Sequence, residues 1–253
     1  MTARTLVLGV AAALLAADIA CFAGEHLAEG RATPDRRAEL ADERRSHELD
    51  IQFYLERVAR DPQGAADRVT LAGLYLQHAR ETGSYQDYGR AEQYARASLG
   101  MRHQHNARAF ALLASALLAQ HRFDEARMSA ESLVAWEPWV PSHQAMLGEI
   151  AFEMGRYDQA RGLFDSLRHD AARLDVAPRL ARWADLNGHT ASARLLLRNA
   201  YADALTLKHL PREQVAWFAL RAGDLEFRAG RLDEAQRLYE EGLGIVPGDY
   251  RLE

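Results

Sequence analysis

The feature that most constrains this chain is a 34-residue unit that occurs twice in direct succession, beginning at Ala107. The first copy reads ARAFALLASALLAQHRFDEARMSAESLVAWEPWV, and the second reads PSHQAMLGEIAFEMGRYDQARGLFDSLRHDAARL. Phe123 aligns with Tyr157, and Ala126 aligns with Ala160. A repeat of this length is typical of two antiparallel helices that cannot bury their apolar faces alone, so each pair must stack on the next.

Small residues stand where the helices of each unit are expected to approach closely, since Leu113-Ala114 aligns with Leu147-Gly148. Pro138 ends the first unit, because proline cannot continue a helix interior. In spacing and residue type together, the two copies resemble the tetratricopeptide repeat family. The resemblance implies an all-α fold, a right-handed superhelical solenoid of about five helix-turn-helix repeats.

Three further repeats accompany the central copies, at residues 65–99, 174–206 and 216–248, of which the first is divergent and the last is a close match. The first of them contains the stretch ETGSYQDYGR, which predicts an inner turn longer by seven residues than in the central copies. This is either a tolerated surface insertion or a place where Tyr85 and Tyr88 touch a partner.

The amino terminus has the layout of a secretory signal, in which Arg4 precedes an apolar stretch that is followed by small residues. Residues 1–23 are therefore expected to be a signal peptide cleaved after Ala23. An uncleaved membrane anchor and lipidation of Cys21, the only cysteine, remain as alternatives. Each alternative places the chain outside a bacterial cytoplasm, in the periplasm or beyond the cell, free or anchored to a membrane.

The rest of the chain divides into a polar linker, an amino-terminal helix and a repeat domain. The helix is expected to cap the solenoid as a half-repeat, and the mixed charges of its first part predict a solvated face with local ion pairs. A sixth repeat would begin near Asp249, so we expect either a longer natural array or self-association at the carboxyl end. The predicted divisions are residues 24–34 for the linker, 35–62 for the helix and 63–253 for the tetratricopeptide repeat domain.

Composition and motifs argue against nucleic-acid binding and catalysis. The net charge is −5, so the composition does not indicate the positively charged surface that binds a phosphate backbone. His103 and His105 are expected in a solvated turn and lack the partners of a zinc site. No phosphate-binding loop or nucleophile motif is found, so the sequence predicts no catalytic, cofactor or metal residues and no enzyme.

The tetratricopeptide resemblance implies that the first helix of each repeat lines a concave groove in which peptides bind. The Lys and Asn residues that clamp a carboxyl terminus in some members of the family are absent from these positions. Phe152 and Leu118 are expected to contact the ligand. The predicted partner-binding positions are Leu76, Ser115, Leu118, Glu149, Phe152, Arg182, Asp185, Asp224 and Phe227.

Trp136 and Trp139 flank Pro138, and they either cover the junction between the central repeats or form an exposed anchor for a partner. Taken together, the sequence predicts a non-catalytic protein–protein interaction scaffold that binds an extended or helical protein segment in its concave groove. Two alternatives remain: a regulatory or binding segment of a longer enzyme, and a structural spacer that associates with itself.

Overall fold

Residues 34–252 are described by a computed structural model in which every regular element is helical. A long helix, α2 (Pro34–Arg60), precedes five helix pairs. The pairs are α3 (Ala65–Thr82) with α4 (Tyr85–Met101), α5 (Ala107–Ala119) with α6 (Phe123–Trp136), α7 (Pro141–Glu153) with α8 (Tyr157–Ser166), α9 (Ala177–Leu186) with α10 (Thr190–Thr206), and α11 (Arg212–Arg228) with α12 (Leu232–Ile245). A 3-10 helix, η1 (Arg168–Asp170), follows α8. The prediction of an all-α helical-repeat solenoid is confirmed.

Glycine allows the two helices to approach closely in two of the pairs. A Cβ atom on Gly148 in α7 would lie 2.9 Å from the ring of Phe164 in α8. A Cβ atom on Gly223 in α11 would lie 2.4 Å from the ring of Tyr239 in α12. Both distances are shorter than the optimal separation of about 3.5–4.0 Å between carbon atoms. The tight contact predicted at Gly148 is confirmed.

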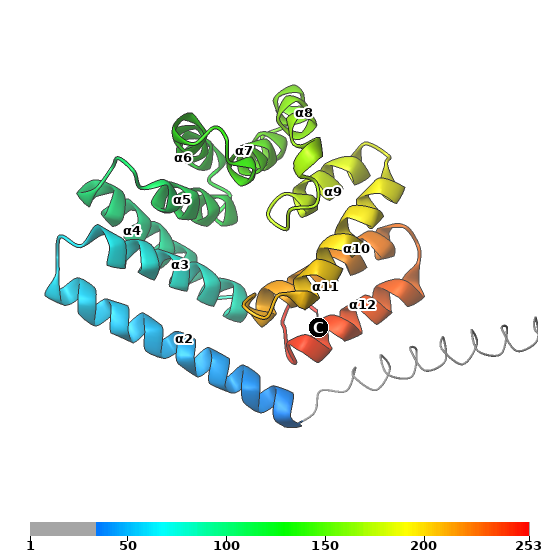
Figure 1. The fold of residues 1–253 in the computed structure, drawn as a ribbon. Helices are drawn as coiled ribbons and strands as arrows, with labels where there is room; N and C mark the ends of the chain where they lie inside the picture. The colour runs from blue at the N-terminus through cyan, green and yellow to red at the C-terminus, as the bar shows by residue number, and fades with distance from the viewer. Residues whose placement is uncertain (1–33, 253) are drawn as a thin grey trace, which may run out of the picture.

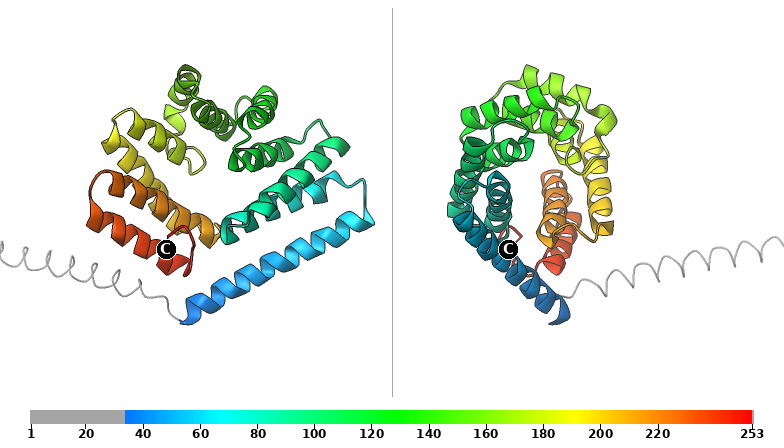
Figure 2. Two further views of the ribbon diagram at one scale, coloured as in Figure 1. Left: turned by 180° about the vertical axis from the view of Figure 1, so that it is seen from behind. Right: turned by 60° about the vertical axis from the view of Figure 1, so that its left-hand side comes forward.

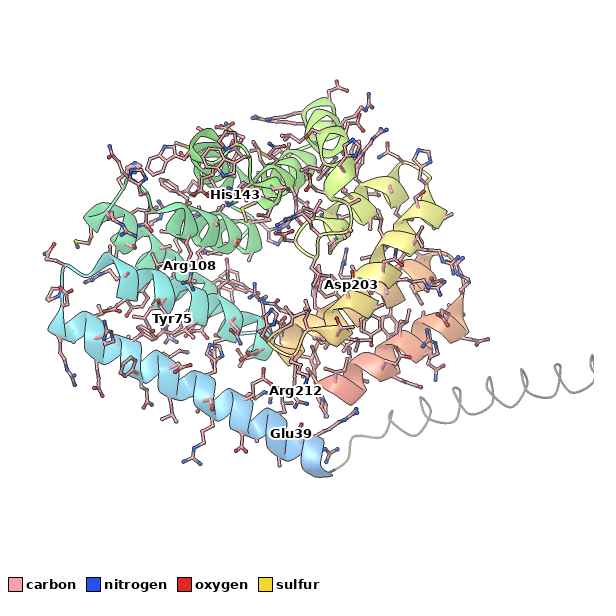
Figure 3. All side chains as sticks on the ribbon, in the orientation of Figure 1. Glu39, Tyr75, Arg108, His143, Asp203 and Arg212 are labelled. Carbon is pink, nitrogen blue, oxygen red and sulfur yellow. The ribbon has the colours of Figure 1, made fainter. Side chains whose placement is uncertain are left out.

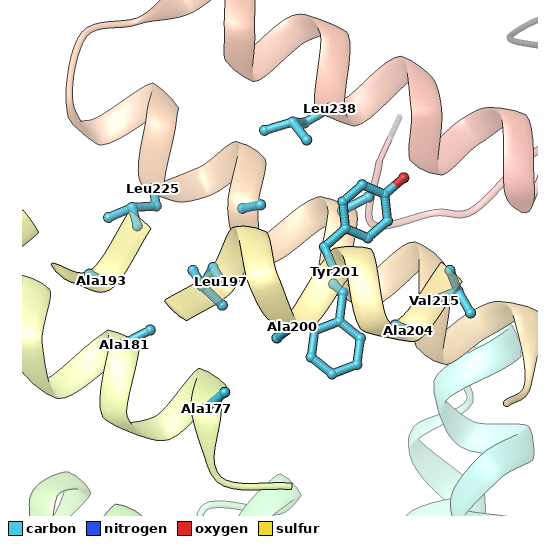
Figure 4. Packing of buried hydrophobic residues seen from close by; sticks show 13 residues of the cluster. Ala177, Ala181, Ala193, Leu197, Ala200, Tyr201, Ala204, Val215, Leu225 and Leu238 are labelled. Atoms are coloured by element: carbon cyan, nitrogen blue, oxygen red, sulfur yellow. The ribbon is translucent and has the colours of Figure 1, made fainter. Parts of the chain in front are cut away.

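Apolar clusters run from each helix pair to the next. One cluster joins α9 and α10 to α11 and α12 through Leu197, Tyr201, Phe218, Leu225 and Leu238, with alanines between the large side chains (Figure 4). Another joins α3 and α4 to α5, α6 and α7. Each pair therefore buries its apolar face on its neighbours, as the repeat pattern requires.

The extra residues of the first pair lengthen its helices and not its turn. Gly83 and Ser84 alone separate α3 from α4, and Gly83 adopts a φ of 73°, the left-handed conformation that ends many helices at glycine. Helices α3 and α4 have 18 and 17 residues, against 13 and 14 in α5 and α6. The ion pair of Arg90 with Asp87, three residues apart, supports the added turn. The predicted long inner turn is wrong.

Helix α8 ends earlier than its counterpart α6, and the short helix η1 takes the place of its last turn. Leu167, just after α8, is nevertheless 2% exposed, and the aligned Leu133 of α6 is fully buried. The leucine at this position of the repeat thus stays buried although α8 has already ended.

The helix pairs curve until the last pair meets the first, so the solenoid forms a closed ring (Figures 1 and 2). The start of α11 lies beside the end of α3, where Arg80 Nε is 3.6 Å from the Glu213 carboxylate. Nearby, the Tyr250 ring covers Gly83, on which a Cβ atom would lie 3.3 Å from the ring. We call the contacts that α2 and the first pair make with the fifth pair and the residues after it the closure seam.

Helix α2 crosses the closure seam along the outside of the ring (Figure 1). Its Leu40 is buried in a cluster with Ala216 of α11. Arg212, the first residue of α11, forms ion pairs with Glu39 and Glu43 of α2, and Figure 3 shows Arg212 close to Glu39. The amino-terminal part of α2 therefore holds the first and last pairs together.

The charges in this part of α2 were expected to form a solvated face with local ion pairs, and that expectation is wrong for several of them. Glu39 and Glu43 pair with a residue far along the chain. His47 is 6% exposed and bonds to Glu81 and to the Leu74 carbonyl of α3. These side chains form contacts with other helices, and they are not simply exposed to solvent.

Residues 246–252 fold back over the end of the last pair. Leu252 packs so closely on Gly242 that a Cβ atom there would lie 2.7 Å from it. Arg251 donates a 2.7 Å hydrogen bond to the Glu213 carboxylate and pairs with Asp249. These residues therefore pack on the last pair, while self-association at the carboxyl end stays a prediction.

Within residues 34–252, no helix combines the length and the apolar character needed to cross a bilayer. The predicted signal peptide or anchor, residues 1–23, and residues 24–33 of the predicted linker lie outside the described residues. Pro34, the last residue of that linker, is the first residue of α2.

Candidate protein-binding cavity inside the ring

The inner side of the ring contains a cavity of about 880 Å³, which we call the inner cavity. It is bordered by α3, α7, α9 and α11, which come from four different helix pairs (Figure 1). Because only the closure seam brings α3 and α11 together, the cavity requires a closed ring. Its lining residues are Arg80, Glu149, Leu174, Asp175, Pro178, Arg179, Arg182, Glu213, Gln214, Trp217, Phe218, Arg221 and Arg228.

Carboxylates position the arginines of the inner cavity. Arg179 donates from Nε to Glu149 at 2.7 Å, which links α9 to α7. Arg182 likewise pairs with Glu153 of α7, and its guanidinium lies 4.7 Å from the ring centroid of Phe152. Each guanidinium is therefore fixed across a helix junction by a charge-assisted contact, the stronger kind of hydrogen bond.

The arginines of α11 are held in the same way. Arg221 pairs with Asp224 at 3.2 Å on its own helix, and Arg228 pairs with Asp185 of α9 at 3.2 Å. Burial lowers the pKa of the Arg221 guanidinium. The charge of Asp224 opposes this shift, and the positive charges of Arg182 and Arg228 add to it. This side of the cavity therefore concentrates positive charge.

Asp224 has a second partner in the tyrosine that packs on Gly223. Tyr239 donates its hydroxyl to Asp224 at 3.1 Å. Burial of the phenol, together with the neighbouring Asp224 charge and this hydrogen bond, raises the pKa of Tyr239 to about 12. Tyr239 thus remains neutral and connects the packing of α11 on α12 with the position of Arg221.

Apolar side chains form the remaining walls. Leu174 and Pro178 border the cavity at α9, and Trp217 and Phe218 border it at α11. Phe218 is 5% exposed and belongs to the core, whereas Trp217 packs only partly against it. The inner cavity thus combines aromatic surface with fixed guanidinium groups, a pattern that is common where proteins bind other proteins.

The structure brings several of the predicted partner-binding residues together. Glu149 and Arg182 border the inner cavity, and the Phe152 ring lies against the Arg182 guanidinium. Asp185 and Asp224 do not border it, but they hold Arg228 and Arg221, which do. For these five residues the structure supplies a common location, while their contact with a ligand stays a prediction.

The other predicted positions lie elsewhere. Leu76 is 5% exposed and packs among α3, α4 and α5, so the expectation that it faces a groove is wrong. Ser115 donates its hydroxyl to the Ala111 carbonyl, and Leu118 packs partly against the core. Phe227 is 59% exposed but does not border the cavity.

The sequence reasoning missed Arg80, Gln214, Trp217 and Arg221. The last three recur every three or four residues along α11, which is a helical spacing that marks one face. The register transferred from the resemblance pointed instead to Asp224 and its neighbours. Closure of the ring, which the repeats alone do not reveal, decides which face of α11 points inward.

The two tryptophans that flank Pro138 behave differently. Trp136 is partly buried, and its ring lies 5.7 Å from His103 and 5.5 Å from Phe110. Trp139 is 74% exposed. Trp136 therefore packs within the second pair and against the connection from the first pair, so its covering of the junction between the central repeats stays a prediction, whereas Trp139 keeps the exposure that a partner anchor requires.

The tyrosines and histidines singled out in the sequence line no pocket described above. Tyr85 is 64% exposed at the start of α4, and the half-buried Tyr88 is close to the closure seam, where burial raises its pKa and the nearby Tyr250 adds to the shift. His103 and His105 lie in the connection between α4 and α5. Residues 34–252 contain no group of three or more His, Cys, Asp or Glu side chains arranged to hold a metal ion.

These features define a helical-repeat protein with a concave, partly aromatic inner surface. A sequence model of the tetratricopeptide repeat family matches residues 117–182. That match falls on the central copies, where the resemblance was strongest, and it agrees with the fold of the five helix pairs. Residues 117–182 are therefore similar to tetratricopeptide repeats, and the remaining helix pairs share the same helical-repeat fold.

Two solved structures have a similar fold. One is the crystal structure of the APC/C hetero-tetramer Cut9–Hcn1, with a TM-score of 0.66 and 15% sequence identity, over 81% of this chain and 38% of that chain. The other is TTC0263, a thermophilic tetratricopeptide repeat protein of Thermus thermophilus, with a TM-score of 0.56 and 20% identity, over 72% and 94% of the two chains. No curated protein matches the sequence. The similarity supports the fold alone, because one fold can serve many functions.

Proposed function

We propose that this protein is a non-catalytic scaffold that binds an extended or helical segment of another protein in the inner cavity. The observation that carries the proposal is the cavity itself, which is bordered by helices of four different pairs and combines Trp217 with fixed arginines. Concave surfaces of this kind are the usual binding surfaces of solenoid proteins. The similar fold in the Cut9–Hcn1 hetero-tetramer, an assembly of two kinds of chain, supports a role in assembly.

Site-specific photocrosslinking tests this proposal. We would place a photoreactive amino acid at Gln214, which borders the inner cavity, and in a control protein at Leu195, which is 61% exposed on α10 and does not border it. After exposure to an envelope extract of the host, we expect a discrete adduct with another protein from Gln214 alone. The same adducts from both positions, or none from Gln214, would contradict binding in the cavity.

The proposal places the scaffold outside the cytoplasm, exported or held at a membrane through residues 1–23. The support is the charged, apolar and small-residue order of that segment. A reporter enzyme that is active only outside the cytoplasm, fused after Glu253, should be active with the whole chain and inactive when residues 2–23 are deleted. Activity without residues 2–23 would contradict export through this segment.

A further inference from the structure

The inner cavity has more positive than negative groups at its surface. Five arginines border it, against the three carboxylates of Glu149, Asp175 and Glu213. The positive groups come from α3, α9 and α11, so they surround the cavity and do not lie along one helix. The net charge of the chain is nevertheless −5, so the positive character is local.

These arginines retain hydrogen-bonding capacity that the protein does not use. A guanidinium offers five N–H donors. Among the described residues, Arg221 donates only from Nη1, to Asp224, and Arg182 donates only from Nη1, to Glu153. Arg228 uses Nε and Nη2 on a single oxygen of Asp185. The remaining donors are available to a further carboxylate.

Their own ion pairs hold the three guanidinium groups in fixed positions on two helices. Arg182 is on α9, and Arg221 and Arg228 are on α11. Burial and the positive charges of Arg182 and Arg228 lower the pKa of Arg221, and an added negative charge would stabilise its charged form. A bound carboxylate gains charge-assisted hydrogen bonds there without displacing the existing partners.

The neighbouring wall is apolar. Trp217, Phe218 and Pro178 border the same cavity as the arginines. A ligand that matches both parts carries carboxylates and an apolar side chain a short distance apart, which a short stretch of polypeptide supplies.

We propose that the inner cavity selects an acidic protein segment, with Asp or Glu carboxylates bound by Arg182, Arg221 and Arg228 and a nearby apolar side chain against Trp217. This inference rests on the proposed function and names the chemistry of its partner. The donors come from the fourth and fifth pairs and face a cavity that closure of the ring completes.

The test is selection of binders from a random 12-residue peptide library displayed on phage, with the full chain as bait. We expect the selected peptides to be enriched in Asp and Glu next to an apolar residue. A synthetic peptide of the most enriched sequence should bind about tenfold more weakly to Arg221→Gln and to Arg228→Gln, because each loses a charge-assisted contact. Arg198→Gln, a change at an exposed arginine of α10, should bind like the wild type.

The outcomes separate the inference from the proposed function. Enrichment of non-acidic peptides that lose binding in Trp217→Ala would overturn the inference and leave peptide binding in the cavity intact. Acidic peptides that bind the arginine variants as well as the wild type would also overturn it. No enrichment over an empty support would contradict both. Arg228, with a side chain that is half exposed, provides a variant with little risk to folding.

Discussion

The junctions between successive repeats and the closure seam hold the same ring together by different means. Successive pairs meet through fully buried alanines and leucines, such as Ala114 and Leu117. The seam has few apolar contacts, chiefly around Leu40, and depends on charged residues such as Glu213 and Arg212. Apolar burial is largely insensitive to salt and pH, whereas ion pairs are sensitive to both. The ring should therefore open at the seam before any repeat unfolds.

The largest effect is expected from a cavity in a repeat junction. Leu117→Ala removes a side chain that is 1% exposed between the second and third pairs. We expect the free energy of unfolding to fall by about 2–5 kcal/mol, the range of buried Leu→Ala changes. Urea denaturation followed by circular dichroism measures this. The exposed leucine change Leu195→Ala is the control and should alter stability by less than about 0.5 kcal/mol.

A substitution at the closure seam should open the ring without unfolding the repeats. Glu213 is 4% exposed, accepts a hydrogen bond from Arg251 and lies 3.6 Å from Arg80. Glu213→Gln removes the carboxylate near Arg80 and leaves Arg251 with Asp249 alone, so we expect a loss in seam stability at the lower end of about 3–5 kcal/mol. Small-angle scattering should show a larger radius of gyration with unchanged helix content. Loss of helix content together with expansion would mean that the seam and the repeats are one cooperative unit.

Two helical glycines allow the same Gly→Ala substitution to be compared at a tightly packed position and at an open one. Gly223→Ala places a methyl group 2.4 Å from Tyr239, so helices α11 and α12 must separate, at a cost of about 1–3 kcal/mol. Gly162→Ala in α8 meets no atom within 4 Å and should stabilise the protein by up to about 1 kcal/mol, because alanine favours helix. Thermal melts of the two variants should move in opposite directions.

The smallest effect concerns pH at α2. Both ring nitrogens of His47 face acceptors, Glu81 at 2.9 Å and the Leu74 carbonyl at 3.0 Å, and only the protonated ring donates to both. Burial lowers the pKa of His47, but the hydrogen bond and charge of Glu81 outweigh it, so the net shift is upward. A raised pKa means that this stabilisation is complete below the ordinary value of 6.5 and is lost as the pH rises through the folded value.

The melting temperature of the wild type should therefore fall slightly more between pH 6 and pH 8 than that of His47→Gln, which cannot titrate. Glu81 acts in the opposite range. Burial raises its pKa, yet the hydrogen bonds from His47 and Gln77 lower it overall, so its contribution is lost only in acid. Parallel pH profiles for the two proteins would show that His47 does not titrate during unfolding.

The five helix pairs could be predicted because the interactions that form them are local. Phe123, Tyr157 and their aligned neighbours recur at fixed spacing, and each pair needs only the next to bury its face. The lengthened helices around Gly83 escaped prediction, since the same residues are compatible with a turn or with added helix. Glu149 and Arg182 were expected on the inner side of the solenoid, and they border the inner cavity because they lie on the inner face of regular repeats. Their contact with a partner stays a prediction.

The closure seam could not be predicted from the sequence. It joins Arg212 to Glu39 and Glu43, which are 173 and 169 residues away. The small rotation between each repeat and the next accumulates over five pairs, and the sum decides whether the ends meet. The same accumulated rotation turns Trp217 and Arg221 toward the inside of the ring. The sequence pattern of a single repeat predicts neither the closure of the ring nor the inward orientation of these two residues.

The most direct test of the closed ring is a distance measurement across the seam. In a Cys21→Ser background, spin labels at Gln86, on the first turn of α4, and at Lys208, just before α11, report the separation of the first and last pairs by pulsed electron resonance. A closed ring should give one narrow, short distance at low salt, and this distance should become broad and longer in Glu213→Gln. A broad, long distribution in the protein without the Glu213 change would contradict closure, and with it the inner cavity.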